Sequence, residues 1–159
     1  MGTEQPISVL HAVLSATEIS VQTATEAVDS ATAGAVVSFS GVVRNHDGGR
    51  SVERLSYTAH PSAEHVLAEV VAEVVARHSD SSGAAGSPSG AGGKIRIWAA
   101  HRVGPLQIGD AALVCAVSAA HRGQAFAVCS ELVDLIKERV PIWKEQFFTD
   151  GSVEWVGAG

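Results

Sequence analysis

The chain has 159 residues, of which 46% are apolar and 18% charged, and its formal net charge is −6 at neutral pH. This composition excludes a disordered chain, and the acidic charge argues against a protein whose main task is to hold a nucleic-acid backbone. No apolar run approaches the roughly 20 residues that cross a bilayer, and no secretory leader opens the chain, so we expect one domain over residues 1–159, in the cytoplasm and away from membranes.

Three strands and a short helix are predicted in the first 60 residues. Residues 7–15 favour a strand, and Ser20 is a candidate N-cap for a short helix. Residues 34–44 are rich in β-branched side chains and end in the turn-forming cluster 45–49. The chain is expected to return as a strand over residues 52–59.

A long helix and a flexible loop follow. Pro61 and Ser62 supply a helix start, and apolar side chains then recur at three- and four-residue spacing: Val66, Leu67, Val70, Val71, Val74 and Val75. Residues 79–93 are dominated by Ser, Gly and Ala and predict a flexible loop within the domain. A domain boundary there is the alternative, but neither side alone has enough strands for a stable sheet.

The second half predicts four strands and one helix. Strands are expected over residues 94–103 and 111–120, joined by a turn at 104–110. A helix begins at His121 and Arg122 and ends before Pro141, with a predicted apolar stripe: Phe126, Cys129, Leu132, Val133 and Ile136. Residues 142–148 and 152–156 favour two strands around a turn. The fold class is therefore α/β or α+β, with helices packed on a mixed sheet.

Several common kinds of site are disfavoured by spacing. The seven histidines form no pattern typical of zinc ligands, and Cys115 and Cys129 are interpreted as buried thiols because they are not paired in sequence. The chain also has no phosphate-binding P-loop and no Gly-x-Ser-x-Gly nucleophile motif.

Positive charge is confined to the later part of the chain, since all 11 Lys and Arg residues lie at or after Arg44. His121 and Arg122 at a helix start could bind an anion, although a solvated helix start explains them as well. Lys137 and Lys144 flank Pro141, and a partly desolvated lysine can donate a proton or stabilise negative charge. The alternative for Lys137 is a favourable cation at a helix C-terminus.

Four ordered motifs resemble the large subunit of molybdopterin synthase, the MoaE family. They are the segment 34–46, HRVG at 101–104 with Gly109 and Asp110, Ala120-His121-Arg122 with Ala125 and Phe126, and Lys137-x-x-x-Pro141-x-Trp143-Lys144. The similarity extends from about residue 7 to 157. It implies a hammerhead-type fold with an added antiparallel β subdomain.

The resemblance also implies a reaction and partners. A sulfurtransferase of this family moves two sulfurs from the thiocarboxylated C-terminus of a small ubiquitin-like subunit to cyclic pyranopterin monophosphate, which becomes molybdopterin. The expected assembly is a homodimer with one small subunit bound to each copy, a heterotetramer. No cofactor or metal is expected, because the partner's tail supplies the sulfur.

The matched positions imply roles for named residues. Lys137 and Lys144 match the family's catalytic lysines and also contact substrate. Further substrate-binding positions are Val42, Val43, Arg44, His121, Arg122, Glu145 and Gln146. Two alternatives remain: a module that binds a ubiquitin-like tail or a small anion without catalysis, and a structural dimerisation domain whose cations are dispersed over the surface.

Overall fold

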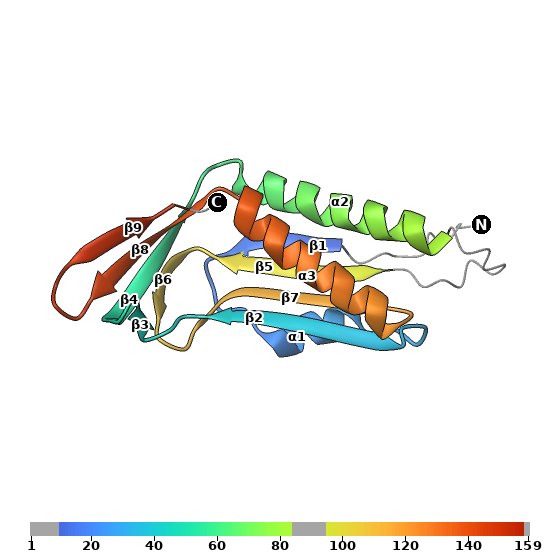
Figure 1. The fold of residues 1–159 in the computed structure, drawn as a ribbon, viewed down its shortest axis with the longest axis horizontal. Coiled ribbons are helices and arrows are strands. Elements are labelled where there is room, and N and C mark those ends of the chain that lie inside the picture. Colours follow the sequence, from blue (N-terminus) through green and yellow to red (C-terminus); the bar gives the residue numbers. More distant parts are fainter. Residues whose placement is uncertain (1–9, 84–94, 158–159) are drawn as a thin grey trace.

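The computed structural model describes residues 10–83 and 95–157, and its layers are drawn in Figure 1. A four-stranded sheet carries helices on both faces, and a second, five-stranded sheet stands at one end of it. The predicted class, helices on a mixed sheet with an added antiparallel subdomain, is confirmed.

The main sheet has the strand order β1-β5-β7-β2. Its strands are β1 (Leu10–Ser15), β2 (Ala35–Val42), β5 (Arg96–Arg102) and β7 (Ala111–Ala119). β1 runs parallel to β5, whereas β7 is antiparallel to both of its neighbours. The predicted pairing of the strands around residues 94–103 and 111–120 is therefore present.

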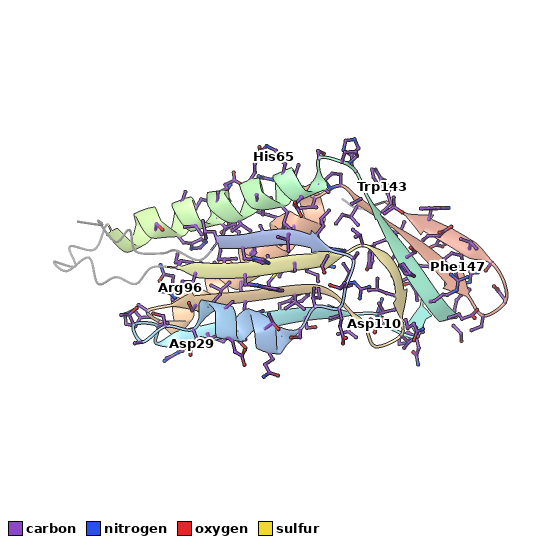
Figure 2. The ribbon with its side chains drawn as sticks, turned by 180° about the vertical axis from the view of Figure 1, so that it is seen from behind. Asp29, His65, Arg96, Asp110, Trp143 and Phe147 are labelled. Carbon is purple, nitrogen blue, oxygen red and sulfur yellow. The ribbon has the colours of Figure 1, made fainter. Side chains whose placement is uncertain are left out.

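Three helices cover this sheet, α2 (Ala63–Gly83) and α3 (Arg122–Arg139) on one face and α1 (Val21–Val28) on the other (Figures 1 and 2). Alternation along β5 explains the two layers, because successive side chains of a strand point to opposite faces. Ile97 and Ala99 pack in the core that contains α2 and α3, while Trp98 and Ala100 pack against α1. Ser20 caps α1 as predicted, its Oγ accepting a 3.1 Å hydrogen bond from the amide of Thr23.

The second sheet is antiparallel throughout. Its strands are β3 (His46–Asp47), β4 (Arg50–Ala59), β6 (Gly104–Gln107), β8 (Ile142–Phe148) and β9 (Val153–Val156). The order is β3-β4-β8-β9, and β6 also pairs with β4. Gly48 and Gly49 have φ of 58° and 80° in the tight turn between β3 and β4, a conformation that glycine adopts without strain.

One predicted strand pairing and one predicted turn differ from the structure. β4 does not return along β2: it leaves the main sheet and pairs with β6, about 50 positions later in the chain, and with β8, about 85 to 95 positions later. The predicted turn at 104–110 contains β6, because tertiary pairing with β4 overrides the local turn chemistry of Gly104 and Pro105. Long-range pairing of this kind leaves no local signal.

Two helix predictions also need correction. α2 extends to Gly83, so residues 79–83 are helical and not part of a loop, because extending a formed helix requires no new nucleus. Residues 84–93 of the predicted loop lie outside the described residues. Phe126 is 60% exposed, whereas Ala125 is fully buried. The buried stripe of α3 therefore begins at Ala125, and one further residue turns the side chain by about 100° toward solvent.

Candidate active site

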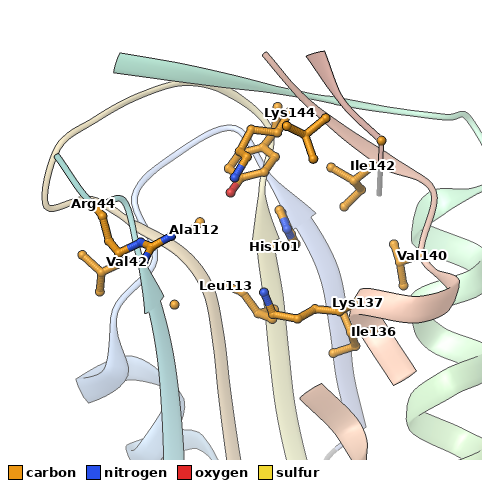
Figure 3. A pocket seen from close by; sticks show the side chains of 14 residues that line it. Val42, Arg44, His101, Ala112, Leu113, Ile136, Lys137, Val140, Ile142 and Lys144 are labelled. Carbon is orange, nitrogen blue, oxygen red and sulfur yellow. The ribbon is translucent and has the colours of Figure 1, made fainter. Parts of the chain in front are cut away.

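A cavity of about 350 Å³ lies where the main sheet, the second sheet and the C-terminal end of α3 meet (Figure 3). This volume is within the range of sites that hold small molecules. The lining residues come from segments far apart in the chain: Gly41, Val42, Arg44, Tyr57, His101, Ala112, Leu113, Ile136, Lys137, Val140, Ile142, Lys144, Val156 and Gly157.

The two predicted lysines both line this cavity. Lys137 lies in the last turn of α3, which ends at Arg139 with Val140 as C-cap because Pro141 cannot continue the helix. The chain then enters β8, where alternation places Ile142 and Lys144 on the same face. A helix end and a strand start thus direct two cations into one space.

Arg44 brings a third cation to the cavity from the end of β2. Its guanidinium is 3.8 Å from a carboxylate oxygen of Asp47, and Gln146 donates a 2.8 Å hydrogen bond to the other oxygen of that carboxylate. The Gln146 hydrogen bond, assisted by the charges of Lys144 and Arg44, holds the pKa of Asp47 below its usual value. Asp47 is therefore an ionised carboxylate beside the positive charges of Arg44 and Lys144.

His101 and Tyr57 also line the cavity, although the sequence indicated neither as a site residue. Their rings meet edge to face, with centroids 4.8 Å apart and planes at 85°. Burial raises the pKa of Tyr57. His101 belongs to the HRVG motif and lies next to the end of β5, and a histidine in that motif was the one signal available in the sequence.

Of the four other predicted substrate-binding positions near Arg44 and Lys144, only one lines the cavity. Val42 lines the cavity, but Val43 points the other way and packs with Leu55, Leu106 and Ala112 in a small core. Glu145 follows Lys144 on β8, so strand alternation turns it to the opposite face. Gln146 is buried and bonds to Asp47, so it supports the edge of the cavity without lining it.

Arg122 begins α3 and His121 is its N-cap, whereas Lys137 lies in the last turn, and Figure 1 shows the two ends of this helix at different places along the main sheet. Fifteen residues separate Arg122 from Lys137, which corresponds to about 22 Å of helix. Both side chains are exposed, and His121 is the N-cap residue without a side-chain capping bond. Within one chain, the structure does not bring these two residues to Lys137 and Lys144.

The two cysteines are buried free thiols, as predicted. Burial raises the pKa of both Cys115 and Cys129, so neither is a ready nucleophile. In the described part of the chain, no group of three or more His, Cys, Asp or Glu side chains is arranged to hold a metal ion. No helix among the same residues is long and apolar enough to cross a membrane.

The charge pattern of the cavity favours anions. Lys137 enters from α3, Lys144 from β8 and Arg44 from the segment between β2 and β3, while apolar walls are supplied by Val42, Leu113, Ile136 and Ile142. Cations beside apolar walls attract negative groups more strongly than cations in open water, because the local dielectric constant is lower. The arrangement suits an anionic small molecule, or a reaction in which negative charge develops.

Known proteins are similar to this chain in sequence and in fold. The family model described as MoaE protein matches residues 14–139. The molybdopterin synthase catalytic subunit 1 of Mycobacterium tuberculosis is 37% identical over 139 residues, covering 87% of this chain and 85% of that protein. The molybdopterin synthase catalytic subunit of Aspergillus oryzae is 35% identical over 151 residues, covering 94% of this chain and 76% of that protein. The crystal structure of molybdopterin synthase from Staphylococcus aureus superposes with a TM-score of 0.75 at 32% identity, covering 92% of this chain and 96% of that one.

Proposed function

The chain belongs to the MoaE protein family, and from this membership we propose that it is the catalytic subunit of a molybdopterin synthase. The proposed activity is sulfur transfer in molybdenum cofactor biosynthesis. The observation that carries it is the meeting of Arg44, Lys137 and Lys144 in one cavity with apolar walls.

The proposed substrates match the charge of that cavity. Cyclic pyranopterin monophosphate carries a phosphate, and the donor is a thiocarboxylate at the C-terminus of a small ubiquitin-like subunit. Two anions repel each other unless fixed cations offset their charge, and three cationic side chains at the cavity provide that offset. Two successive transfers produce the dithiolene of molybdopterin.

Each cation has a proposed role. Lys137 meets the terminal carbonyl of the partner's tail and stabilises negative charge that develops there. Lys144 positions the substrate and assists opening of its cyclic phosphate. Arg44 binds the phosphate, since a guanidinium can donate two parallel hydrogen bonds to it. The sulfur comes from the partner, so the proposal needs no bound cofactor.

The proposed assembly is a homodimer with one small subunit on each copy, in the cytoplasm. The name "catalytic subunit" carried by the relatives is in keeping with a second, smaller subunit. His121 and Arg122 are about 22 Å from Lys137 along α3, so their proposed substrate contacts require the cavity of a second copy. A dimer would then place cations from both copies at each site.

The test combines the purified chain with a thiocarboxylated small subunit and cyclic pyranopterin monophosphate. Molybdopterin formation is followed by the fluorescence of its oxidised derivative. We expect product that depends on both proteins. Binding of the partner without any product would refute catalysis and favour a module that only binds the tail.

A further inference from the structure

His101 occupies a position in the cavity that the roles proposed above leave unused. It is the penultimate residue of β5 and is partly buried. In Figure 3 its ring lies between the side chains of Lys137 and Lys144. A histidine between two proposed catalytic lysines is within reach of the space where substrate and tail would meet.

The hydrogen bonding of His101 defines its tautomer. Nδ1 lies 2.7 Å from the backbone oxygen of Arg102, and a carbonyl oxygen can only accept, so Nδ1 carries the proton. In the neutral ring, Nε2 then has a free lone pair. Among the described residues Nε2 has no hydrogen-bond partner, and the residue lines the cavity. The hydrogen bond of Nδ1 therefore orients the ring, and the lone pair of Nε2 is available to a molecule in the cavity.

The surroundings of His101 favour the neutral ring. Burial lowers its pKa, the hydrogen bond to Arg102 partly opposes that effect, and the charge of Lys137 lowers the pKa further. Three other titratable or charged groups around His101 also line the cavity: Tyr57 of β4, Lys144 of β8 and Arg44 beyond β2. A fourth is Glu64 of α2, which accepts a hydrogen bond from the amide of Leu14, the β1 residue opposite His101. Lys137 is the one whose charge shifts the pKa of His101.

The proposed reaction contains a step that needs a proton acceptor. A thiocarboxylate sulfur attacks the substrate carbon, the carbon–oxygen bond to the cyclic phosphate at that carbon breaks as the ring opens, and the oxygen leaves as part of the phosphate monoester. The new carbon–sulfur bond joins the partner to the substrate as a thioester. Water must then add to the acyl carbon, the carbon–sulfur bond to the partner breaks, and the tail leaves as a carboxylate while the sulfur stays on the substrate. The water loses its protons in this step, and a base positioned beside it accelerates the reaction.

We propose that Nε2 of His101 is the general base that takes a proton from this water, which makes His101 a further catalytic residue of the proposed sulfur transfer. Other groups in the cavity are less suited. The ammonium groups of Lys137 and Lys144 have no free lone pair, and the guanidinium of Arg44 cannot accept a proton. Burial keeps the phenol of Tyr57 protonated.

The test is a single turnover that separates the two steps. Wild-type and His101→Asn proteins are mixed with thiocarboxylated partner and substrate, and the partner's intact mass distinguishes thiocarboxylate, thioester adduct and free carboxylate. An asparagine amide retains a donor near the Arg102 carbonyl but has no basic nitrogen. We expect the adduct to form at nearly the wild-type rate and its release to slow by about 100-fold or more, so the adduct accumulates.

The pH dependence of release provides a second measurement, which needs no variant. In the wild-type protein, release should rise with pH as His101 loses its proton and then become constant. Because burial lowers the pKa of His101, this rise should lie below the ordinary histidine value of about 6.5. His101→Asn should lose this rise. His65→Asn is the matched control, because His65 is exposed on the outer side of α2 and pairs with Glu69 (Figure 2).

Three results would overturn the assignment. They are release by His101→Asn within twofold of wild type, equal slowing of adduct formation and release without accumulation, and wild-type release that does not vary with pH. An absence of product from the wild-type protein would instead refute the proposed function itself, so the two failures are distinguishable.

Discussion

Lys137 and Lys144 line one cavity although Pro141, which lies between them, ends the helix that carries Lys137. The break changes the chain from helix to strand, and β8 then pairs with β4, placing Lys144 directly opposite Tyr57. Each lysine is thus attached to a regular element, which limits the backbone motion available to it. Fixed cations stabilise developing charge without reorganisation during the reaction.

Replacement of Lys137 by alanine should abolish product formation. We expect a loss of about 100-fold or more in the rate of molybdopterin synthesis, because the proposed stabilising charge at the acyl carbonyl is removed. Binding of the partner, measured by calorimetry, should largely persist. Arg139→Ala is the matched control: Arg139 lies in the same last turn but pairs with Glu73, away from the cavity. Full synthesis by Lys137→Ala would contradict its assigned role.

Replacement of Arg44 by alanine should weaken substrate binding more than it slows the chemical step. One charge-assisted contact to phosphate would be lost, so KM should rise about tenfold or more while kcat changes less. Steady-state kinetics at low and high salt would measure both constants. Arg50→Ala is a suitable control, because Arg50 packs over the Phe148 ring and pairs with Asp150. An unchanged KM would show that Arg44 does not bind the phosphate.

Local patterns predicted most of the elements but not how the second sheet is assembled. β-branched residues indicated β2 and β7, and the apolar spacing of residues 66–75 indicated α2. β4 lies between β6 and β8, which are about 50 and about 85 to 95 residues later in the chain. No periodicity encodes that choice.

The site could be predicted only in part for the same reason. Lys137, Lys144 and Arg44 were located through the family motifs, and the structure brings them together. Glu145 differs from Lys144 by one position, and strand alternation alone turns it away. His101 stands in the HRVG motif, but the motif alone gives it no role, since the cavity groups around it come from β4, β8 and α3.

An ion-pair network between α2 and α3 should make the free energy of unfolding fall as the pH becomes acidic. Glu131 accepts hydrogen bonds from His78, at 2.7 Å, and from Arg77. Both bonds lower the pKa of Glu131, and the bond from His78 has the larger effect. A carboxylate with a lowered folded pKa stabilises the fold above its unfolded pKa, and this contribution disappears as the pH falls through the folded value.

Glu131→Gln tests this network. At pH 7 the substitution should lower the free energy of unfolding by about 0.5–1 kcal/mol, a value discounted for solvent screening. The difference should shrink at a second, acidic pH below the ordinary glutamate pKa of about 4.3, as the wild-type carboxylate takes up its proton. Urea denaturation at the two pH values measures it. Glu138→Gln is the control, because Glu138 forms no ion pair within the described residues. An equal loss at both pH values would indicate a packing effect.

The proposed assembly predicts that two inactive variants restore activity to each other. Lys137 and Arg122 lie at opposite ends of α3, so a site that uses both would take them from different copies. In a mixed dimer of Lys137→Ala and Arg122→Ala, one site carries both substitutions and the other carries neither.

Coexpression of the two variants with different affinity tags allows the mixed dimer to be isolated. A random mixture should regain about a quarter of the wild-type activity, and the purified mixed dimer about half, because one of its two sites is intact. Each variant alone should remain inactive. The matched control is a mixed dimer of Lys137→Ala and Lys144→Ala. The two substitutions are again carried by different chains, but Lys137 and Lys144 line the cavity of the same chain. In that dimer each site lacks one lysine, so no activity should return. Absence of activity from the first pair would show that Arg122 does not serve the site of a second copy.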